Sequence, residues 1–299
     1  QHVHNMKYIA AQPELKYYEW QVDTMIHSYI KQGVDPNDII ILWGNTGEYN
    51  CDGLRKKYPT VNFHRYPYKR EAYPPAIKPY LMSKYFGSCK CTQSEQYYYA
   101  DADTILTKPL PDFASDTVFM SDTKSYIGYD YIISKGEEIL DIMCKAAKVD
   151  KNIIKERRHE SGGCQFVFQG TDSKFWKEVY VTSNSLYREM RRYNQEHKEK
   201  YKGTYPIQAW TAEMWATLWQ FFKKGYKTEI SKDLAFAWAT DPLNMLEGKR
   251  ILHNAGVTDK HKDFFKKSNW QNENPPSDLN ITKTHCSYYY YKQVLEATC

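Results

Sequence analysis

The feature that most constrains the fold is a continuous apolar run at residues 39–43, Ile-Ile-Ile-Leu-Trp, which ends at Gly44. A strand without polar alternation is typical of a parallel sheet, where both of its faces are buried. An earlier apolar run covers residues 7–11, and apolar residues recur at helical spacing over 17–30. Together these segments predict a strand–helix–strand unit with parallel strands.

The same alternation continues along the chain. It predicts further segments in this order: a helix near 54–58, strands near 61–65 and 96–100 with a helix over 76–86 between them, a strand near 166–169, helices over 175–192 and 212–223, and a polar loop over 193–203. Alternating strands and helices favour an α/β fold, with a mostly parallel, Rossmann-like central sheet and helices on both faces.

The domain organisation follows from length and from the lack of an evident linker. A chain of 299 residues is long enough for one large α/β domain. We expect a single domain over 6–299, with a nucleotide-binding half over 6–110 and an acceptor-binding and catalytic half over 111–299. Residues 1–5 are interpreted as a tag or a trimmed end.

Composition excludes some classes and leaves others open. The sequence has no run of eighteen apolar residues, so no membrane span is expected, and a net charge of +5 with dispersed basic residues does not indicate a nucleic-acid-binding surface. The 27 tyrosines and eight tryptophans suit sugar rings or nucleobases as well as half-exposed strand positions. The sequence does not predict an oligomeric state.

Cysteines and one sequon bear on the cellular location. The seven cysteines form an odd set, and the close pair Cys89 and Cys91 lacks the spacing of zinc-binding hooks. We therefore expect reduced cysteines and a cytoplasmic protein. The alternative is a luminal domain of a Golgi enzyme, because Asn280-Ile281-Thr282 is an N-glycosylation sequon.

Two carboxylates follow the predicted strand 96–100. They are Asp101 and Asp103, separated by Ala102. Because ligands of open α/β sheets bind at the carboxyl ends of the strands, these oxygens are candidates for a divalent cation and for a ribose or diphosphate. A solvated turn is the plain alternative for an Asp-x-Asp pair.

Three further segments carry candidate chemistry. Gly162 and Gly163 precede a predicted strand, and Gln165 follows them. The two glycines either allow a ligand to approach the backbone closely or form an ordinary turn. Glu213 lies in the first turn of a predicted helix that Thr211 caps, where it either complements the helix dipole or acts as a general base. Apolar surroundings from neighbouring tryptophans would raise the pKa of Glu213 and suit it to accept a proton.

The last segment is a strand end that delivers His253, followed by Gly256 and the basic residues Lys260, Lys262, Lys266 and Lys267. An imidazole is a suitable third ligand for a manganese-like ion, and lysines neutralise a leaving diphosphate. Taken alone, such a histidine is more often structural. Tyr8, Ala10 and Gln12 lie where the first strand ends and are expected to line the donor-nucleotide pocket.

Taken in order, Asp101-Ala102-Asp103, Gly162-Gly163, Thr211-Ala212-Glu213 and His253 resemble the four landmarks of the GT-A glycosyltransferases. The segments around them also look like the hydroxyproline arabinosyltransferase and peptidyl-serine galactosyltransferase group and its phage-type relatives. This resemblance implies a nucleotide diphosphate sugar as donor, with Mn²⁺ or Mg²⁺. It makes Asp101, Asp103 and His253 metal ligands and Glu213 the candidate base. If Glu213 deprotonates the acceptor for in-line attack, the anomeric carbon is inverted.

The alternatives concern stereochemistry, acceptor and class. Gln165 under the sugar would suit a retaining reaction, and the His253-x-x-Gly256 spacing resembles retaining galactosyltransferases. The acceptor is expected to be a hydroxymethylated base in phage DNA, with UDP-sugar as donor, or else a peptide or a glycan. A metal-dependent nucleotidyltransferase and a non-catalytic sugar- or nucleic-acid-binding module are the other classes.

Overall fold

The computed structural model describes residues 6–299, so the interpretation of residues 1–5 lies outside the described part. The chain forms two compact units. The first unit contains residues 6–69, 97–113 and 232–299, and the second contains 70–96 and 114–231. The chain therefore crosses between the units several times instead of dividing once near residue 110, and the single-domain assignment stays a prediction.

The first unit is built on four parallel strands in the order β3-β2-β1-β4. Their bounds are β1 Lys7–Pro13, β2 Ile39–Asn45, β3 Asn62–Pro67 and β4 Gln96–Tyr99. The apolar run that opens β2 is buried throughout, as its lack of polar alternation predicts. All four strands were predicted from the sequence, within a few residues at their ends.

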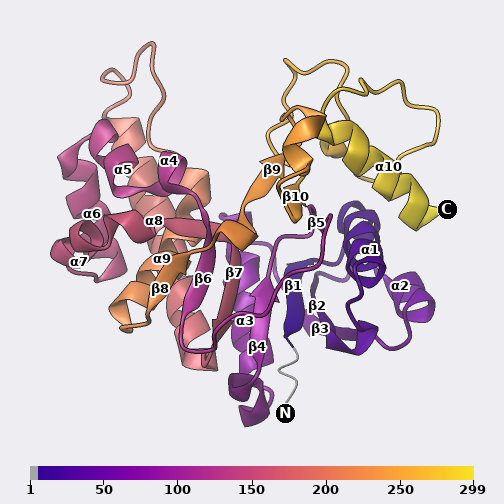
Figure 1. Ribbon diagram of the computed structural model, residues 1–299. Coiled ribbons are helices and arrows are strands. Elements are labelled where there is room, and N and C mark those ends of the chain that lie inside the picture. Colours follow the sequence, from indigo (N-terminus) through magenta and orange to yellow (C-terminus); the bar gives the residue numbers. More distant parts are fainter. Residues whose placement is uncertain (1–5) are drawn as a thin grey trace. The chain divides into compact units, whose positions relative to one another are not determined.

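Helices and a second, smaller sheet complete the first unit. The helices are α1 Lys16–Lys31, α2 Asp52–Lys57 and α10 Cys286–Thr298, and the smaller sheet joins β5 Thr104–Leu106, β10 Ile251–His253 and β9 Phe236–Trp238 in that order. Figure 1 shows α10 lying beside α1, although the two helices come from opposite ends of the chain. Trp20, Phe265 and Tyr290 pack in the core that they share.

The second unit combines three strands with seven α-helices. Its elements are α3 Ile77–Phe86, β6 Val118–Asp122, α4 Lys124–Ile127, α5 Tyr129–Lys135, α6 Glu137–Ala147, α7 Lys151–Glu156, β7 Gly162–Gln169, α8 Ser173–Glu196, α9 Ala212–Lys223 and β8 Thr228–Ile230. Strand β6 pairs parallel with β8 and antiparallel with β7. The α/β class with mostly parallel strand pairs is thus confirmed.

Two expectations need correction here. Helix α8 continues to Glu196, so the first part of the predicted loop 193–203 is helical; buried Tyr193 extends the apolar face of the helix. Cys89 and Cys91 are joined by a disulfide instead of being reduced, and their Cα atoms, 5.3 Å apart, lie within the range for bridged cysteines. Among residues 6–299, no helix combines the length and the apolar character that crossing a membrane requires.

A buried carboxylate holds together the carboxyl ends of three strands in the first unit. Glu14 follows β1 and accepts hydrogen bonds from Asn45 Nδ2 of β2 at 2.8 Å and from the Cys51 amide at 2.7 Å. Arg65 of β3 donates to both carboxylate oxygens, at 2.6 Å each. Burial alone would raise the pKa of Glu14, but these donors outweigh it and lower the pKa.

We expect Glu14→Gln to lower the free energy of unfolding by about 2 kcal/mol at pH 7, because the charge-assisted bonds from Arg65 are lost. A lowered folded-state pKa contributes stability above the unfolded value of about 4.5, and this stability is lost as the pH falls through the folded value. The deficit of the variant should therefore shrink as the pH falls below about 4.5. Urea unfolding across this range measures it, with Glu229→Gln at an exposed site as control. A deficit independent of pH would contradict the assignment.

Candidate functional site

The two carboxylates predicted as ligands lie in a tight turn that leaves the sheet. Strand β4 is buried throughout, and the chain turns at Asp101 and Asp103 before it enters β5. The Thr104 amide donates to Asp101 O at 3.1 Å, and the Asn254 amide donates to Asp103 O at 2.8 Å. These backbone bonds hold both aspartates at the carboxyl end of β4, where open α/β sheets bind ligands.

His253 reaches this turn because of strand pairing. It is the last residue of β10, which pairs antiparallel with β5 so that His253 lies opposite Thr104. On the other side β10 pairs parallel with β9, where the ring of Trp238 stacks on the imidazole with centroids 5.6 Å apart. Both contacts hold the ring of His253 beside the Asp101–Asp103 turn.

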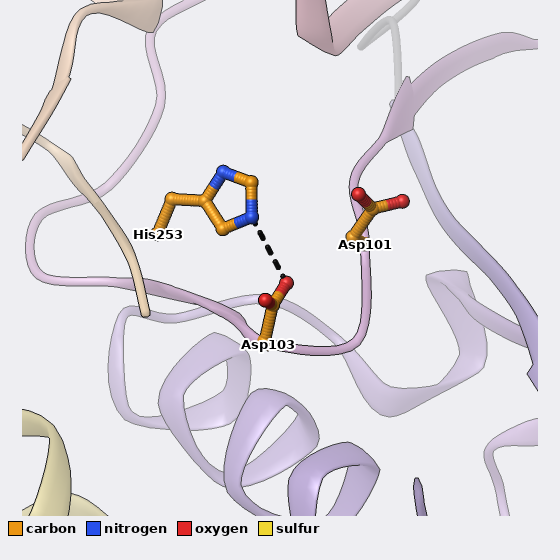
Figure 2. A group of neighbouring side chains, drawn as sticks. All are labelled: Asp101, Asp103 and His253. Carbon is orange, nitrogen blue, oxygen red and sulfur yellow. Dashed lines mark ion pairs between the residues drawn. The ribbon is translucent and has the colours of Figure 1, made fainter. Parts of the chain in front are cut away.

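Figure 2 shows the three side chains converging. One potential ligand atom from each of Asp101, Asp103 and His253 lies within 4.8 Å of the others. His253 Nε2 is 3.1 Å from Asp103 Oδ1, and the ammonium of Lys267 contacts the other oxygen of the same carboxylate. The site is thus a cluster of two carboxylates and an imidazole, in which His253 is buried and Asp101 is half-buried.

Electrostatics favour the ionised form of Asp103. Burial would raise its pKa, but His253 and Lys267 outweigh burial and hold the pKa of Asp103 well below its usual range. The carboxylate therefore has an imidazole and an ammonium as partners in the fold itself. Two carboxylates and one imidazole are a ligand set suited to Mn²⁺, and less so to Mg²⁺, which prefers oxygen ligands alone. The residues fit the metal that the sequence predicts.

Sequence reasoning assigned the diphosphate to Lys260 and Lys262. Both lysines are exposed in the loop after β10. The lysine that contacts the cluster is Lys267, 164 residues beyond Asp103 in the chain. The only signal for Lys267 in the sequence was that it belongs to the same basic run. Because that run contains several lysines, only the course of the loop decides which of them contacts Asp103.

The residues expected to line the nucleotide pocket alternate along β1. Tyr8, Ala10 and Gln12 are all buried. The ring of Tyr8 packs against Tyr29 and Tyr98, with centroids 5.2 and 5.6 Å apart, and Gln12 Nε2 donates to Leu42 O at 2.9 Å. These contacts explain the three residues as parts of the core, and their role in donor binding stays a prediction.

In the second unit, the double glycine begins β7 where that strand packs closely against β6. A Cβ on Gly162 would lie 2.5 Å from Met120 Cβ and 2.8 Å from Ser121 O, so only glycine fits there. The pairing of β6 and β7 shifts register just beyond this point, and Cys164 in the irregular stretch has a positive φ of 62°. Close strand packing thus accounts for Gly162 without a ligand.

Gln165 follows in the same irregular stretch. Its side chain is fully buried, and its Oε1 accepts a hydrogen bond from the hydroxyl of Ser121 at 2.6 Å. Its Nε2 has no partner among the described residues. A buried amide with an unused donor is poised to bind a polar group, so the prediction that Gln165 lies under a sugar keeps a physical basis.

Glu213 lies in the first turn of α9, as predicted, but a distant residue takes over the capping role. Thr211 occupies the N-cap position without a side-chain cap, and the amide of Glu213 instead donates to the hydroxyl of Tyr73 at 2.9 Å. The carboxylate of Glu213 pairs with the ammonium of Lys78. The carboxylate of Glu213 is thus part of an ion pair, and of the neighbouring tryptophans Trp210 is 57% exposed and Trp215 is buried.

The structure thus brings together Asp101, Asp103 and His253 in the first unit. It places Gly162, Gly163, Gln165 and Glu213 in the second unit. Sequence reasoning named Lys267 only as one of several basic residues after His253, and it missed Lys78 and Tyr73, which contact Glu213. None of these three is marked by a local motif.

No family model matches this sequence, and no curated protein matches it either. Solved structures resemble the fold at low identity. The apo structure of the bifunctional glycosyltransferase WbbM has a TM-score of 0.47 and 12% identity, over 97% of this chain and 52% of that one. The galactosyltransferase LgtC, in complex with donor and acceptor sugar analogs, has a TM-score of 0.47 and 11% identity, over 98% of this chain and 97% of LgtC.

The apo form of the glycosyltransferase GlyE of Streptococcus pneumoniae TIGR4 likewise has a TM-score of 0.47 and 10% identity, over 97% of this chain and 60% of GlyE. The chain thus spans only about half the length of WbbM and three fifths of GlyE, but nearly all of LgtC.

Proposed function

We propose that this protein is a metal-dependent glycosyltransferase that moves a sugar from a nucleotide diphosphate sugar, with UDP-sugar as the first candidate, to a hydroxyl acceptor. The observation that carries the proposal is the cluster of Asp101, Asp103 and His253 at the carboxyl end of β4. Strand pairing alone brings His253 to an Asp-x-Asp turn, in the chain order that resembles the GT-A glycosyltransferases.

In this proposal, Asp101, Asp103 and His253 would hold Mn²⁺ or Mg²⁺. When bound, the metal would stabilise the negative charge that develops on the leaving diphosphate. The ammonium of Lys267, in contact with Asp103, adds a positive charge to the same place. These groups act on the donor.

The acceptor side of the proposal rests on Glu213. Its amide is fixed by Tyr73 and its carboxylate is paired with Lys78, so the side chain has a defined position. A fixed carboxylate can accept the proton of an acceptor hydroxyl, with inversion as the stereochemical outcome. Gln165 would support a retaining reaction instead. Candidate acceptors are a hydroxymethylated DNA base and a hydroxyl of a peptide or glycan.

Calorimetric titration with nucleoside diphosphates, diphosphate sugars and nucleoside triphosphates, each with and without Mn²⁺, tests the proposal. We expect one diphosphate and its sugar conjugate to bind only with Mn²⁺, because a metal held by the carboxylates would offset the negative charge of the diphosphate. Metal-dependent binding of a triphosphate alone would favour nucleotidyl transfer. The absence of binding by every nucleotide would overturn the proposal in favour of a binding module.

A further inference from the structure

A second candidate site lies in a pocket of the second unit, formed by helix α8 and the segment just before α3. The cavity volume is about 620 Å³, a size suited to a small ligand. Six of its lining residues carry the argument: Tyr73, Asn184, Tyr187, Arg188, Arg191 and Arg192. No acidic residue lines it within the described part of the chain.

The arginines of this pocket carry more positive charge than neighbouring carboxylates neutralise. Arg188 and Arg192 both pair with Glu189, at 3.7 and 3.2 Å, whereas Arg191 forms no ion pair with a carboxylate among residues 6–299. Three guanidinium groups and one carboxylate thus leave two positive charges. All three arginines are exposed, and a cluster of net positive charge of this kind favours a dianionic ligand.

Aromatic stacking orients the arginine that has no ion pair. The rings of Tyr73 and Tyr187 are stacked with centroids 4.3 Å apart. The guanidinium of Arg191 lies over Tyr187, 5.3 Å from the ring centroid, and one of its nitrogens is 3.3 Å from the Tyr187 hydroxyl. A guanidinium held in this way loses little entropy when it binds a planar or tetrahedral anion through two hydrogen bonds.

The pocket is also connected to the candidate base. The hydroxyl of Tyr73 donates to Trp210 O at 2.6 Å and accepts from the amide of Glu213 at 2.9 Å. Tyr73 therefore contacts the pocket with its ring and the start of α9 with its hydroxyl. A ligand bound in this pocket would lie close to the group proposed to deprotonate the acceptor.

We propose that this pocket binds a phosphate monoester and that the acceptor of the transferase carries such a group. The statement about the acceptor rests on the proposed function, whereas the binding of a phosphate monoester in this pocket does not. A small phosphate compound is favoured over a nucleic acid because the basic residues line one pocket instead of a long track, and the net charge of the chain is only +5.

The test is calorimetry with inorganic phosphate and a hexose 6-phosphate, without metal or nucleotide so that the donor site is silent. We expect Arg191→Gln to weaken binding of the hexose 6-phosphate about tenfold or more, because a charge-assisted bond is lost. Lys177→Gln, which removes an exposed positive charge from the same helix outside the pocket, should leave the affinity within about twofold.

Several results would overturn the pocket assignment. These are equal affinity in Arg191→Gln and the wild type, absence of binding at millimolar phosphate, and tight binding of a single-stranded oligonucleotide that both variants weaken equally. Failure of the proposed function looks different: phosphate binding would persist while no sugar is transferred. If sugar transfer proceeds and Arg191→Gln does not change the KM for a phosphorylated acceptor relative to its unphosphorylated form, only the pocket proposal falls.

Discussion

Replacing His253 with alanine or Asp101 with asparagine should reduce Mn²⁺-dependent turnover by about 10³-fold or more, because metal catalysis supplies several kcal/mol of stabilisation in the transition state. Both side chains offer ligand atoms to the same cluster. Steady-state kinetics across a Mn²⁺ titration measure the loss. A second readout is the rise in melting temperature on adding Mn²⁺, which both variants should lose.

The choice of Asp101 avoids an ambiguity. Asp103 pairs with both His253 and Lys267, so its removal would leave the imidazole and the ammonium without their partner and lower stability as well. Asp112→Asn, at an exposed carboxylate of the same unit, is the matched control and should retain both activity and Mn²⁺-dependent stabilisation. Normal Mn²⁺-dependent rates in either ligand variant would remove the proposed metal site.

Glu213→Gln should lower kcat by about 10²- to 10⁴-fold while donor affinity remains unchanged, because a general base acts only in the transfer step. Glutamine has nearly the shape of glutamate, and the backbone bond from the Glu213 amide to Tyr73 does not depend on the side chain. Calorimetry with the Mn²⁺–nucleotide complex measures binding, and product formation measures kcat.

Two further variants sharpen this test. Glu156→Gln, at an exposed position of the same unit, should have wild-type activity. Lys78→Met removes the cationic partner of Glu213 and should change the pH dependence of kcat as well as its value, since Lys78 acts through Glu213. If Glu213→Gln is fully active, the base lies elsewhere, and the buried amide of Gln165 becomes the residue to examine for a retaining reaction.

The sequence by itself determined strands β1 to β4, five of the α-helices (α1, α2, α3, α8 and α9) and the chemistry of the candidate ligands. Unbroken apolar runs and helical spacing are local patterns, and they placed β1, β2, β4 and α9 within a few residues. The position of Asp101 and Asp103 after a buried strand predicted the end of the sheet at which they lie, because the carboxyl ends of parallel strands share one edge. The strand β7 was predicted near 166–169, but its antiparallel pairing with β6 was not, since an apolar strand does not reveal the direction of its neighbour.

Only the tertiary structure decided which residues meet. The pairing of β10 with β5 placed His253 at the aspartate turn, and the course of a loop selected Lys267 from a run of lysines. Likewise Tyr73 reached the start of α9 from 140 residues away, and Lys78 paired with Glu213 over 135 residues. Such contacts arise from packing between distant segments, and no periodicity within one segment encodes a partner that lies on another.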